Sequence, residues 1–390
     1  MDHSREPHQA AARVSIARCP DYQPEQVSHG LRAALDRLGG MKRFVSKGDR
    51  VLLNPNFLIG RSPERCVNTH PAVVRAVAQQ VIEAGGKPVI GDSPQLGSAC
   101  NVAEKCLVDS VARELGIEIV EFEPVEVKNP RGKYYRHFVI GRAVLEADVL
   151  INLPKLKTHS LTLLTLAVKN LFGCIPGPRK AQWHFRISRH GADFFARMLL
   201  DLYQLIQPPL TIVDGIVAME GNGPGSGSPR RLGMIVAGTD AVAVDAVITK
   251  ILGVNPQDYP TLRLALSEGY GTPNLQDIAV LGEEIAQAQV SDFILPHMVT
   301  IPGAARALLM KVMKGPLTTR PVIDATRCRG CACCKKACPA GSIAEEAEVL
   351  TIRPGSCIQC LCCMEVCPEG AIELRDGFLL AAARRWTGKK

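Results

Sequence analysis

The sequence predicts an α/β protein with a mostly parallel sheet covered by helices on both faces, followed by a small C-terminal domain rich in cysteine. Two observations support this prediction. Between residues 13 and 290, short apolar runs alternate with segments of helical period, which is typical of βαβ units. Ten of the 15 cysteines then fall between Cys328 and Cys367. A chain of 390 residues is long enough for a large core and an appended small domain.

Eight apolar runs in the first part of the chain are predicted strands, and six segments between them are predicted helices. The strands are expected at residues 14–17, 51–53, 89–90, 117–121, 149–153, 211–213, 234–237 and 278–281. The helices are expected at residues 25–38, 72–84, 101–115, 161–171, 192–206 and 241–252. These elements indicate an α/β domain at 13–290, a linker at 291–320, a cysteine-rich domain at 321–376 and a basic tail at 377–390.

The linker contains a candidate basic amphipathic helix at residues 304–314. Such a helix can lie on a membrane surface, but more often it packs on its own protein. The first 12 residues are polar, and the chain has no run of 18 apolar residues. We therefore expect neither a secretory signal nor a transmembrane segment.

The cysteine-rich domain contains one motif twice, at an offset of 29 residues. Cys328, Cys331, Cys334 and Cys338 recur as Cys357, Cys360, Cys363 and Cys367, and a proline follows the last cysteine of each set. This C-x2-C-x2-C-x3-C-P pattern is typical of ferredoxins with two 4Fe–4S clusters, in which the fourth cysteine of each motif binds the other cluster. The pattern therefore predicts a small α+β domain of the ferredoxin type with two 4Fe–4S clusters.

The predicted ligand sets follow from this exchange of the fourth cysteine. Three thiolates on a tight loop can hold three corners of a cubane, and the proline turns the chain toward the other half of the domain. Cluster 1 is expected to be held by Cys328, Cys331, Cys334 and Cys367. Cluster 2 is expected to be held by Cys357, Cys360, Cys363 and Cys338.

Zinc is the alternative metal, because it also accepts four thiolates. Zinc sites of that kind use two C-x2-C pairs and leave no role for the third cysteine and the Cys-Pro of each motif, so the pattern favours iron–sulfur clusters. Cys333 and Cys362 compete with Cys334 and Cys363 for the third ligand position. The spacing to the Cys-Pro favours Cys334 and Cys363 as ligands. Cys333 and Cys362 are then small thiols packed beside the clusters.

The remaining five cysteines show no metal-binding spacing, so a reducing, cytoplasmic compartment is expected. The formal net charge is +8. Each oxidised cluster with its four thiolates carries about −2, so two clusters lower the net charge to about +4. No block of basic residues and no nucleic-acid-binding motif occurs, and we expect no nucleic-acid partner.

Polar side chains follow four of the predicted strands. They begin at Asn54, Asp92, Lys155 and Asp214. In an open parallel sheet, ligands bind beyond the carboxyl ends of the strands, so these four positions indicate one shared site. Each of these positions taken alone can also be explained by a turn after the strand, because Asn, Asp, Gly and Pro are turn residues.

Lys155, Lys157 and His159 alternate, and in an extended chain they face one side. With Asp214 they are the candidate catalytic residues. Lys169 and the segment 179–186 add cations, which favours an anionic substrate, although a solvated basic face has the same composition.

Further candidates come from single positions. Asp92 and Glu220 are additional carboxylates for acid–base chemistry or a metal. His70 stands where a helix cap is expected, which fits a ligand-facing imidazole, although a lone histidine is more often structural. Glycine occupies every second position from Gly221 to Gly227, unlike the phosphate loops of nucleotide-binding proteins, and indicates a lid over the site.

Five strings of this sequence, taken in order, resemble a bacterial and archaeal family known as domain of unknown function 362. They are NTHP at 68–71, GDSP at 91–94, LPKLKTH at 153–159, VKNLFG at 168–173 and DGIVAMEG at 214–221. The resemblance covers residues 13–282 and implies that a C-terminal ferredoxin module is to be expected. It assigns no catalytic residue.

We expect an iron–sulfur protein that transfers single electrons and works as the electron-transfer arm of an oxidoreductase, with an α/β domain that binds an anionic substrate or partner. One alternative is a non-enzymatic, ferredoxin-like carrier that uses the α/β domain to dock on a redox partner protein. A second alternative is a factor for iron–sulfur assembly or maturation. No catalytic motif of a known class occurs, so whether the chain is an enzyme stays open.

Overall fold

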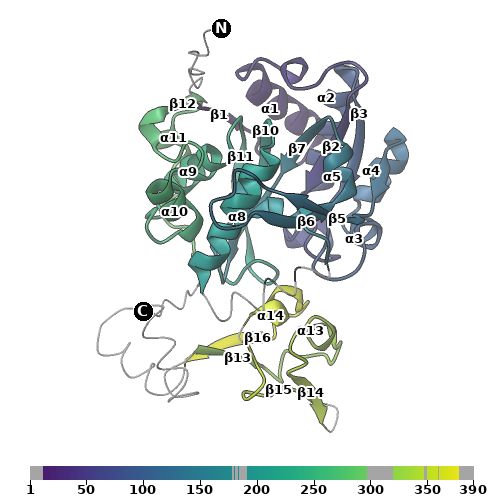
Figure 1. Ribbon diagram of the computed structural model, residues 1–390, viewed down its shortest axis with the longest axis vertical. Coiled ribbons are helices and arrows are strands. Elements are labelled where there is room, and N and C mark those ends of the chain that lie inside the picture. The colour runs from purple at the N-terminus through teal and green to yellow at the C-terminus, as the bar shows by residue number, and fades with distance from the viewer. Residues whose placement is uncertain are drawn as a thin grey trace.

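The structure is a computed structural model that describes residues 12–177, 180, 183, 191–296, 319–346, 349–358 and 360–376. Figure 1 shows the large α/β domain with the cysteine-rich domain against one end of it. The expected linker helix, the basic tail and most of the segment 179–186 lie outside the described residues. No helix in the described ranges is long and apolar enough to cross a membrane.

The α/β domain is built on a ten-stranded sheet with the order β12-β1-β11-β10-β7-β2-β3-β4, to which β8 and β9 are added beside β10. Its strands are β1 (Ala12–Arg18), β2 (Arg50–Pro55), β3 (Lys87–Gly91), β4 (Glu118–Val120), β7 (Val149–Leu153), β8 (Lys155–His159), β9 (Leu163–Thr165), β10 (Leu210–Glu220), β11 (Ser228–Gly238) and β12 (Ile278–Gly282). Six strand pairs are parallel, and β1–β11, β10–β11 and β8–β9 are antiparallel. The mostly parallel sheet is therefore confirmed.

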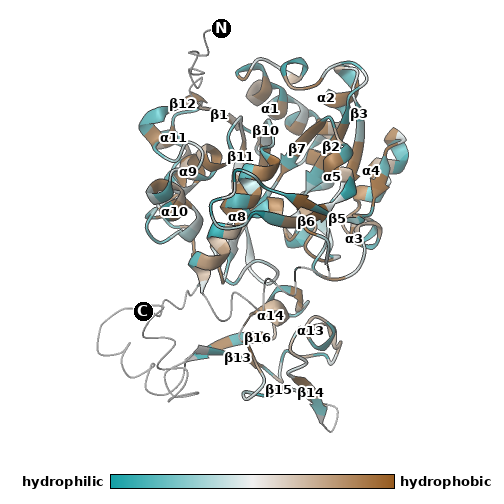
Figure 2. Ribbon diagram, viewed as in Figure 1, coloured by the Kyte–Doolittle hydropathy of each residue, from teal (hydrophilic) through white to brown (hydrophobic). Residues whose placement is uncertain are grey.

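Helices cover both faces of this sheet. They are α1 (Pro24–Asp36), α2 (Pro71–Glu83), α3 (Ala99–Lys105), α4 (Val108–Leu115), α5 (Arg142–Glu146), α6 (Ala167–Asn170), α8 (Ala192–Ile206), α9 (Ala241–Ile251), α10 (Pro260–Glu268) and α11 (Ile285–Ala288). Successive strand residues point to opposite faces, so Leu52 joins the core under α8 and α9 while Leu53 joins the core under α1 and α2. Apolar residues accordingly run along the central strands (Figure 2).

Most predicted elements are confirmed, with two exceptions among the helices. Residues 161–171 form β9 and the short helix α6, because Leu163 adopts a positive φ of 69° and the chain turns back to pair with β8. Every residue from Thr162 to Val168 is buried, and a run that is buried on all sides has no period that separates helix from strand. The predicted helix at 101–115 is broken at Leu107, where φ is 63°.

Two strands are much longer than predicted, and this changes the position of Asp214. β10 and β11 each have 11 residues and form a hairpin, with a register irregularity after Gly215. Asp214 therefore lies inside a strand and not in a turn at its end. Glycine within a strand commonly marks a bulge, so Gly215 is explained by this irregularity. The sequence analysis also missed the hairpin of β5 (Pro124–Lys128) and β6 (His137–Gly141).

The cysteine-rich domain is α+β and repeats itself in its backbone. Its elements are β13 (Thr319–Ile323), α13 (Cys333–Lys336), β14 (Ile343–Glu346), β15 (Val349–Ile352), α14 (Cys362–Val366) and β16 (Ile372–Asp376). β13 pairs with β16, and β14 pairs with β15. Residues 29 positions apart share the same unusual backbone, since Ala332 and Leu361 have φ values of 54° and 62°. The sequence repeat is therefore also a structural repeat.

Candidate metal centre and the adjoining sheet end

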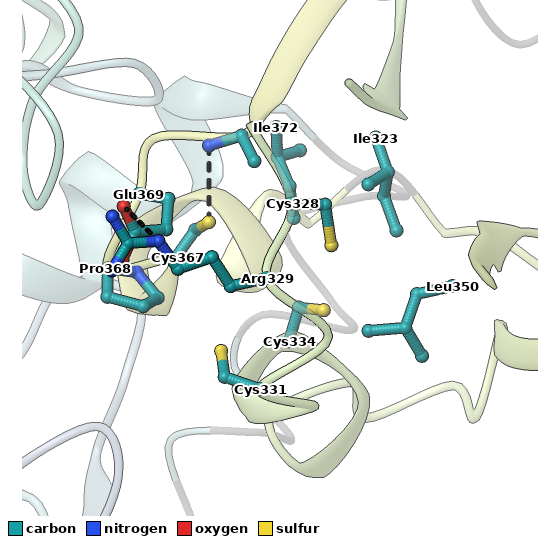
Figure 3. Close-up of a pocket in the computed structure, with 11 residues that line it drawn as sticks. Ile323, Cys328, Arg329, Cys331, Cys334, Leu350, Cys367, Pro368, Glu369 and Ile372 are labelled. Atoms are coloured by element: carbon teal, nitrogen blue, oxygen red, sulfur yellow. Dashed lines mark hydrogen bonds and ion pairs between the residues drawn. The ribbon is translucent and has the colours of Figure 1, made fainter. Parts of the chain in front are cut away.

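The first hollow in the cysteine-rich domain is lined by thiols from both motifs. Its cysteines are Cys328, Cys331 and Cys334 from the first motif and Cys367 from the second. Figure 3 shows these four side chains around the hollow, which has a volume of about 310 Å³. Apolar side chains, including Ile323, Leu350 and Ile372, complete the wall.

The second hollow repeats this arrangement with the motifs exchanged. Its cysteines are Cys357, Cys360 and Cys363 from the second motif and Cys338 from the first. Cys333 and Cys362 are absent from the described lining of both hollows.

A backbone amide donates to the exchanged cysteine of each hollow. The Ser342 N–H lies 3.2 Å from Cys338 Sγ, and the Ala371 N–H lies 3.2 Å from Cys367 Sγ. The glycine before each donor has a positive φ, 58° at Gly341 and 57° at Gly370. Glycine adopts this conformation without strain, which explains its recurrence in the two motifs. Amide donors of this kind stabilise thiolate charge and tune cluster potentials.

The four cysteines of each hollow are spread around its wall. Within the described part of the chain, no three His, Cys, Asp or Glu side chains are close enough to hold a single metal ion. In a 4Fe–4S cluster each thiolate binds a different iron, so four cysteines spread around a hollow are the expected geometry.

The cysteine-rich domain packs against the α/β domain through its second motif. Arg61 Nη2 donates to the Val366 carbonyl at 3.0 Å, and Ser226 Oγ donates to the Cys367 carbonyl at 3.2 Å. A shared apolar cluster joins Ile59, Val67 and Met219 to Leu361, Met364 and Val366. The second motif is thereby held against the α/β domain.

The Gly-rich turn from Gly221 to Gly227 is part of this contact. A Cβ on Gly225 would lie 2.1 Å from the Glu365 carbonyl oxygen, and one on Gly223 would lie 2.2 Å from the Thr158 carbonyl oxygen. The turn is thus packed between β8 and α14. The predicted lid is corrected to a close interdomain contact, and the glycines are explained by the lack of room for side chains.

Asparagines join the carboxyl ends of the neighbouring strands. Asn54 of β2 lies beside Asn152 of β7 in the sheet. Asn170 Nδ2 donates to Asn152 Oδ1 at 2.8 Å and to the Asn54 carbonyl at 3.1 Å, and Asn56 Nδ2 donates to Asn170 Oδ1 at 2.8 Å. This network joins Asn54, one of the four strand-end positions that the sequence indicates, to Asn152 and Asn170.

Lys155 and Asp214 form a buried ion pair on neighbouring strands. Lys155 Nζ lies 2.8 Å from Asp214 Oδ2 and 2.7 Å from Tyr22 Oη, and their side chains are 1% and 0% exposed. Tyr22 Oη also donates to Asp214 Oδ1 at 2.8 Å, and the His70 N–H donates to Oδ2 at 3.0 Å. Lys155 and Asp214 do not face an open crevice, because both side chains are buried and are paired with each other and with Tyr22.

His70 caps helix α2 with its side chain. Its Nδ1 accepts a hydrogen bond of 3.2 Å from the Ala72 N–H, and its ring stacks on Tyr22 with 3.5 Å between the centroids. Burial lowers the pKa of His70 to about 4, so the imidazole is neutral near pH 7. The capping bond explains why a histidine replaces the usual Ser, Asp or Asn.

Three lysines lie at the sheet end, close to the cysteine-rich domain; Lys157 and Lys180 are buried and Lys169 is half-buried. Lys157 Nζ donates to the Val67 carbonyl at 2.6 Å, and Lys180 Nζ donates to the Ser93 carbonyl. Lys169 Nζ and Lys180 Nζ share one aromatic ring, at 4.9 Å and 5.3 Å from its centroid. Lys157, Lys169 and Lys180 are called the lysine group below.

Burial lowers the pKa of every member of the lysine group, to about 8 at Lys169 and well below the ordinary range at Lys157. Two carboxylates, Asp92 and Glu365, oppose this effect at Lys157 and Lys169. Glu365 belongs to the cysteine-rich domain, so the two domains share this charge cluster.

The two other strand-end acids are held locally. Asp92 accepts hydrogen bonds from the Phe57 and Ser93 N–H groups at 2.6 and 2.8 Å, and burial raises its pKa. Glu220 accepts from the Ile294 N–H at 3.1 Å and lies 3.9 Å from an Arg230 nitrogen.

His159 contacts Glu365 across the domain boundary. Its Nε2 lies 3.3 Å from Glu365 Oε1, and its Nδ1 accepts from the Leu161 N–H at 3.1 Å. Because Nδ1 is an acceptor, the neutral imidazole carries its proton on Nε2, the nitrogen that faces Glu365. Burial lowers the pKa of His159, which favours this neutral form. The sequence analysis selected His159 but had no means to find its partner.

Comparisons with known proteins match both parts of the chain. The family described as domain of unknown function (DUF362) matches residues 51–250, and the 4Fe-4S dicluster domain matches residues 320–368. The thylakoid-associated protein sll1697 of Synechocystis sp. is 46% identical over 249 residues, which is 64% of this chain and 77% of that protein.

The similarity to solved structures is weak in one example. That example is the lactate racemase apoprotein of Thermoanaerobacterium thermosaccharolyticum, with 12% identity and a TM-score of 0.37 over 57% of this chain. The match spans 53% of that racemase chain.

Proposed function

Because this chain belongs to the domain of unknown function 362 family and carries a 4Fe–4S dicluster domain, we propose that it holds two 4Fe–4S clusters and is the electron-transfer arm of an oxidoreductase. The match to the 4Fe-4S dicluster domain supports an iron–sulfur protein that transfers electrons. The proposal adds the number of clusters, the cysteines that bind them and the reaction.

The single observation that carries the proposal is the pair of hollows with exchanged cysteines. Cys328, Cys331, Cys334 and Cys367 would hold cluster 1, and Cys357, Cys360, Cys363 and Cys338 would hold cluster 2. When bound, such clusters accept and release one electron each. The chain supplies the thiolates, the amide donors to Cys338 and Cys367, and an apolar wall that limits access of water.

The interdomain contact supports electron transfer to the sheet end. Helix α14 begins with the ligand-motif residues Cys362 and Cys363 and also carries Glu365, which contacts His159 of β8. A molecule bound near His159 would therefore lie close to the second motif. Electron transfer falls off with distance, so this placement favours the sheet end as the place where electrons are used.

The lysine group supports an anionic substrate class. Three lysine side chains face two carboxylates, Asp92 and Glu365, and a pKa of about 8 keeps the Lys169 ammonium charged near pH 7. Lys169 is the member best placed to bind an anion, because its ammonium contacts the Phe172 and Phe195 rings and has no hydrogen bond within the described ranges. Of the four candidate catalytic residues that the sequence indicates, Lys157 and His159 lie near Lys169.

Replacing Lys169 with methionine is expected to weaken the binding of a small dicarboxylate or inorganic phosphate by at least about tenfold, because one charge-assisted contact is lost. Anion binding by the unmodified protein is expected to be strongest below about pH 8 and to fall above it, since Lys169 is charged only below its pKa of about 8. Calorimetric titration between pH 6.5 and 9.5 measures both effects. The matched control is Lys87→Met, an exposed lysine at the opposite end of β3. Equal binding by Lys169→Met and the control would contradict the assignment.

A ferredoxin-like carrier is the second candidate function. The Lys155–Asp214 pair favours it, because two of the expected catalytic side chains are used for structure and the domain then serves to dock a redox partner. The cytoplasmic location expected from the cysteines stays a prediction, and the related protein from Synechocystis is described as thylakoid-associated.

Anaerobic reductive titration tests the proposed function. The full chain is expected to take up about two electrons, one for each cluster. Adding the molecules that bind to the lysine group then separates the two candidates, since an oxidoreductase is reoxidised by its substrate and a carrier only by a protein. Uptake of one electron or none would contradict the proposal.

A further inference from the structure

Arg61 of the α/β domain lies against the cysteine-rich domain, near Cys331 and Cys367 of hollow 1. It lies in the loop between β2 and the 3-10 helix at Pro63–Arg65, and it crosses the domain boundary to donate from Nη2 to the Val366 carbonyl at 3.0 Å. Nη1 donates to the Gly60 carbonyl at 2.9 Å. The two contacts hold the guanidinium beside Val366, the residue that precedes Cys367.

The third donor of this guanidinium has no acceptor. Arg61 Nε is buried and makes no hydrogen bond to the described residues. Burial lowers the pKa of Arg61, whereas the nearby thiol groups of Cys333, Cys331 and Cys367 act in the opposite direction. A guanidinium stays charged even so, and an unused buried N–H is costly unless an acceptor is present. The sulfur atoms of a cluster in hollow 1 are acceptors of the required kind.

The surroundings of the two hollows differ in charge. Hollow 1 is also lined by Arg329 and Glu369, but these form an ion pair of 3.5 Å and compensate each other. No charged side chain lines hollow 2 among the residues described there. Glu365 lies near Cys360, one of its cysteines. Arg61 therefore adds a positive charge beside the cysteines of hollow 1, whereas Glu365, the carboxylate near hollow 2, belongs to the charge cluster of the lysine group.

We propose that Arg61 donates its Nε–H to cluster 1 and raises the reduction potential of that cluster above the potential of cluster 2. This inference rests on the proposed function, since it requires both clusters. Reduction adds one negative charge to a cluster, so a fixed cation and a hydrogen-bond donor favour the reduced form. The electron taken up first therefore resides on cluster 1, and the α/β domain itself supplies the residue that determines this order.

The test is EPR-monitored redox titration of the full chain with Arg61→Gln. The equilibrium constant for reduction of one cluster is expected to fall about tenfold, which is about 59 mV for a one-electron couple, while the other midpoint stays unchanged. Arg65→Gln, which removes an exposed cation from the same loop, is the matched control and should leave both midpoints in place. Unchanged midpoints in Arg61→Gln at full iron content would overturn the inference.

Two further variants keep the test decisive. In a Cys367→Ser background, which should retain only cluster 2, Arg61→Gln is expected to change nothing, and a shift there would contradict the assignment to cluster 1. If Arg61→Gln loses iron, Arg61→Lys replaces it. That variant keeps the charge without the Nε–H, so its midpoint should fall by less than tenfold, and an unaltered midpoint would contradict the hydrogen bond. Failure of the proposed function would differ, because the unmodified chain would lack a second reduction step.

Discussion

Replacing Cys367 with serine is expected to remove cluster 1 and leave cluster 2, so the iron content falls from about eight to about four atoms per chain. The physical reason is that Cys367 lines hollow 1 with three cysteines of the other motif, although it lies in the second motif. Cys338→Ser should do the same to cluster 2. Iron and acid-labile sulfide assays on anaerobically purified variants measure both losses.

The exchange of ligands is decided by pairs of substitutions. Cys328→Ser combined with Cys367→Ser should lose no more iron than either alone, because both side chains belong to one cluster. Cys338→Ser combined with Cys367→Ser should lose nearly all of it. Cys333→Ser is the control, since its side chain is absent from the described wall of both hollows. Additive loss from the first pair would show that the motifs bind their clusters separately.

Replacing Asp214 with alanine is expected to destabilise the α/β domain by about 3–5 kcal/mol. The substitution leaves the Lys155 ammonium buried without its counter-ion, and it also removes the acceptor of Tyr22 and of the His70 N–H. The free energy of unfolding, from urea titration followed by circular dichroism, measures the loss.

The matched control is Asp109→Ala, which breaks the exposed pair with Arg113 and should cost about 0.5 kcal/mol. Combining Asp214→Leu with Lys155→Met should recover only the part of the loss that comes from the unpaired charge, because Tyr22 Oη and the His70 N–H still lack their acceptor. A loss below about 1 kcal/mol for Asp214→Ala would contradict the structural role of the pair and restore Asp214 as a candidate for chemistry.

The parallel sheet and the cysteine motif could be predicted because their signals are local. Hydrophobic periodicity marks each strand by itself, and the spacing from Cys328 to Cys338 lies within 11 residues. The repeat at the same spacing then indicates a second loop of the same shape. Strand β9 was missed, and a helix predicted in its place, because residues buried on all sides carry no periodic signal.

The partners of the candidate site residues could not be predicted, because they come from distant parts of the chain. Asp214 was expected at a strand end, but Lys155 and Tyr22 compensate its charge and allow β10 to continue to Glu220. His159 and Arg61 contact the cysteine-rich domain at Glu365 and Val366, more than 200 residues away in sequence. The glycines of the 221–227 turn signal a close approach, and the sequence alone does not say of what.

The count of iron and acid-labile sulfide in the anaerobically purified full chain tests the central claim most directly, when it is joined to EPR of the reduced protein. Two clusters predict about eight atoms of each per chain and two interacting paramagnetic centres. About four atoms of each, or one isolated paramagnetic centre, would contradict the two-cluster account.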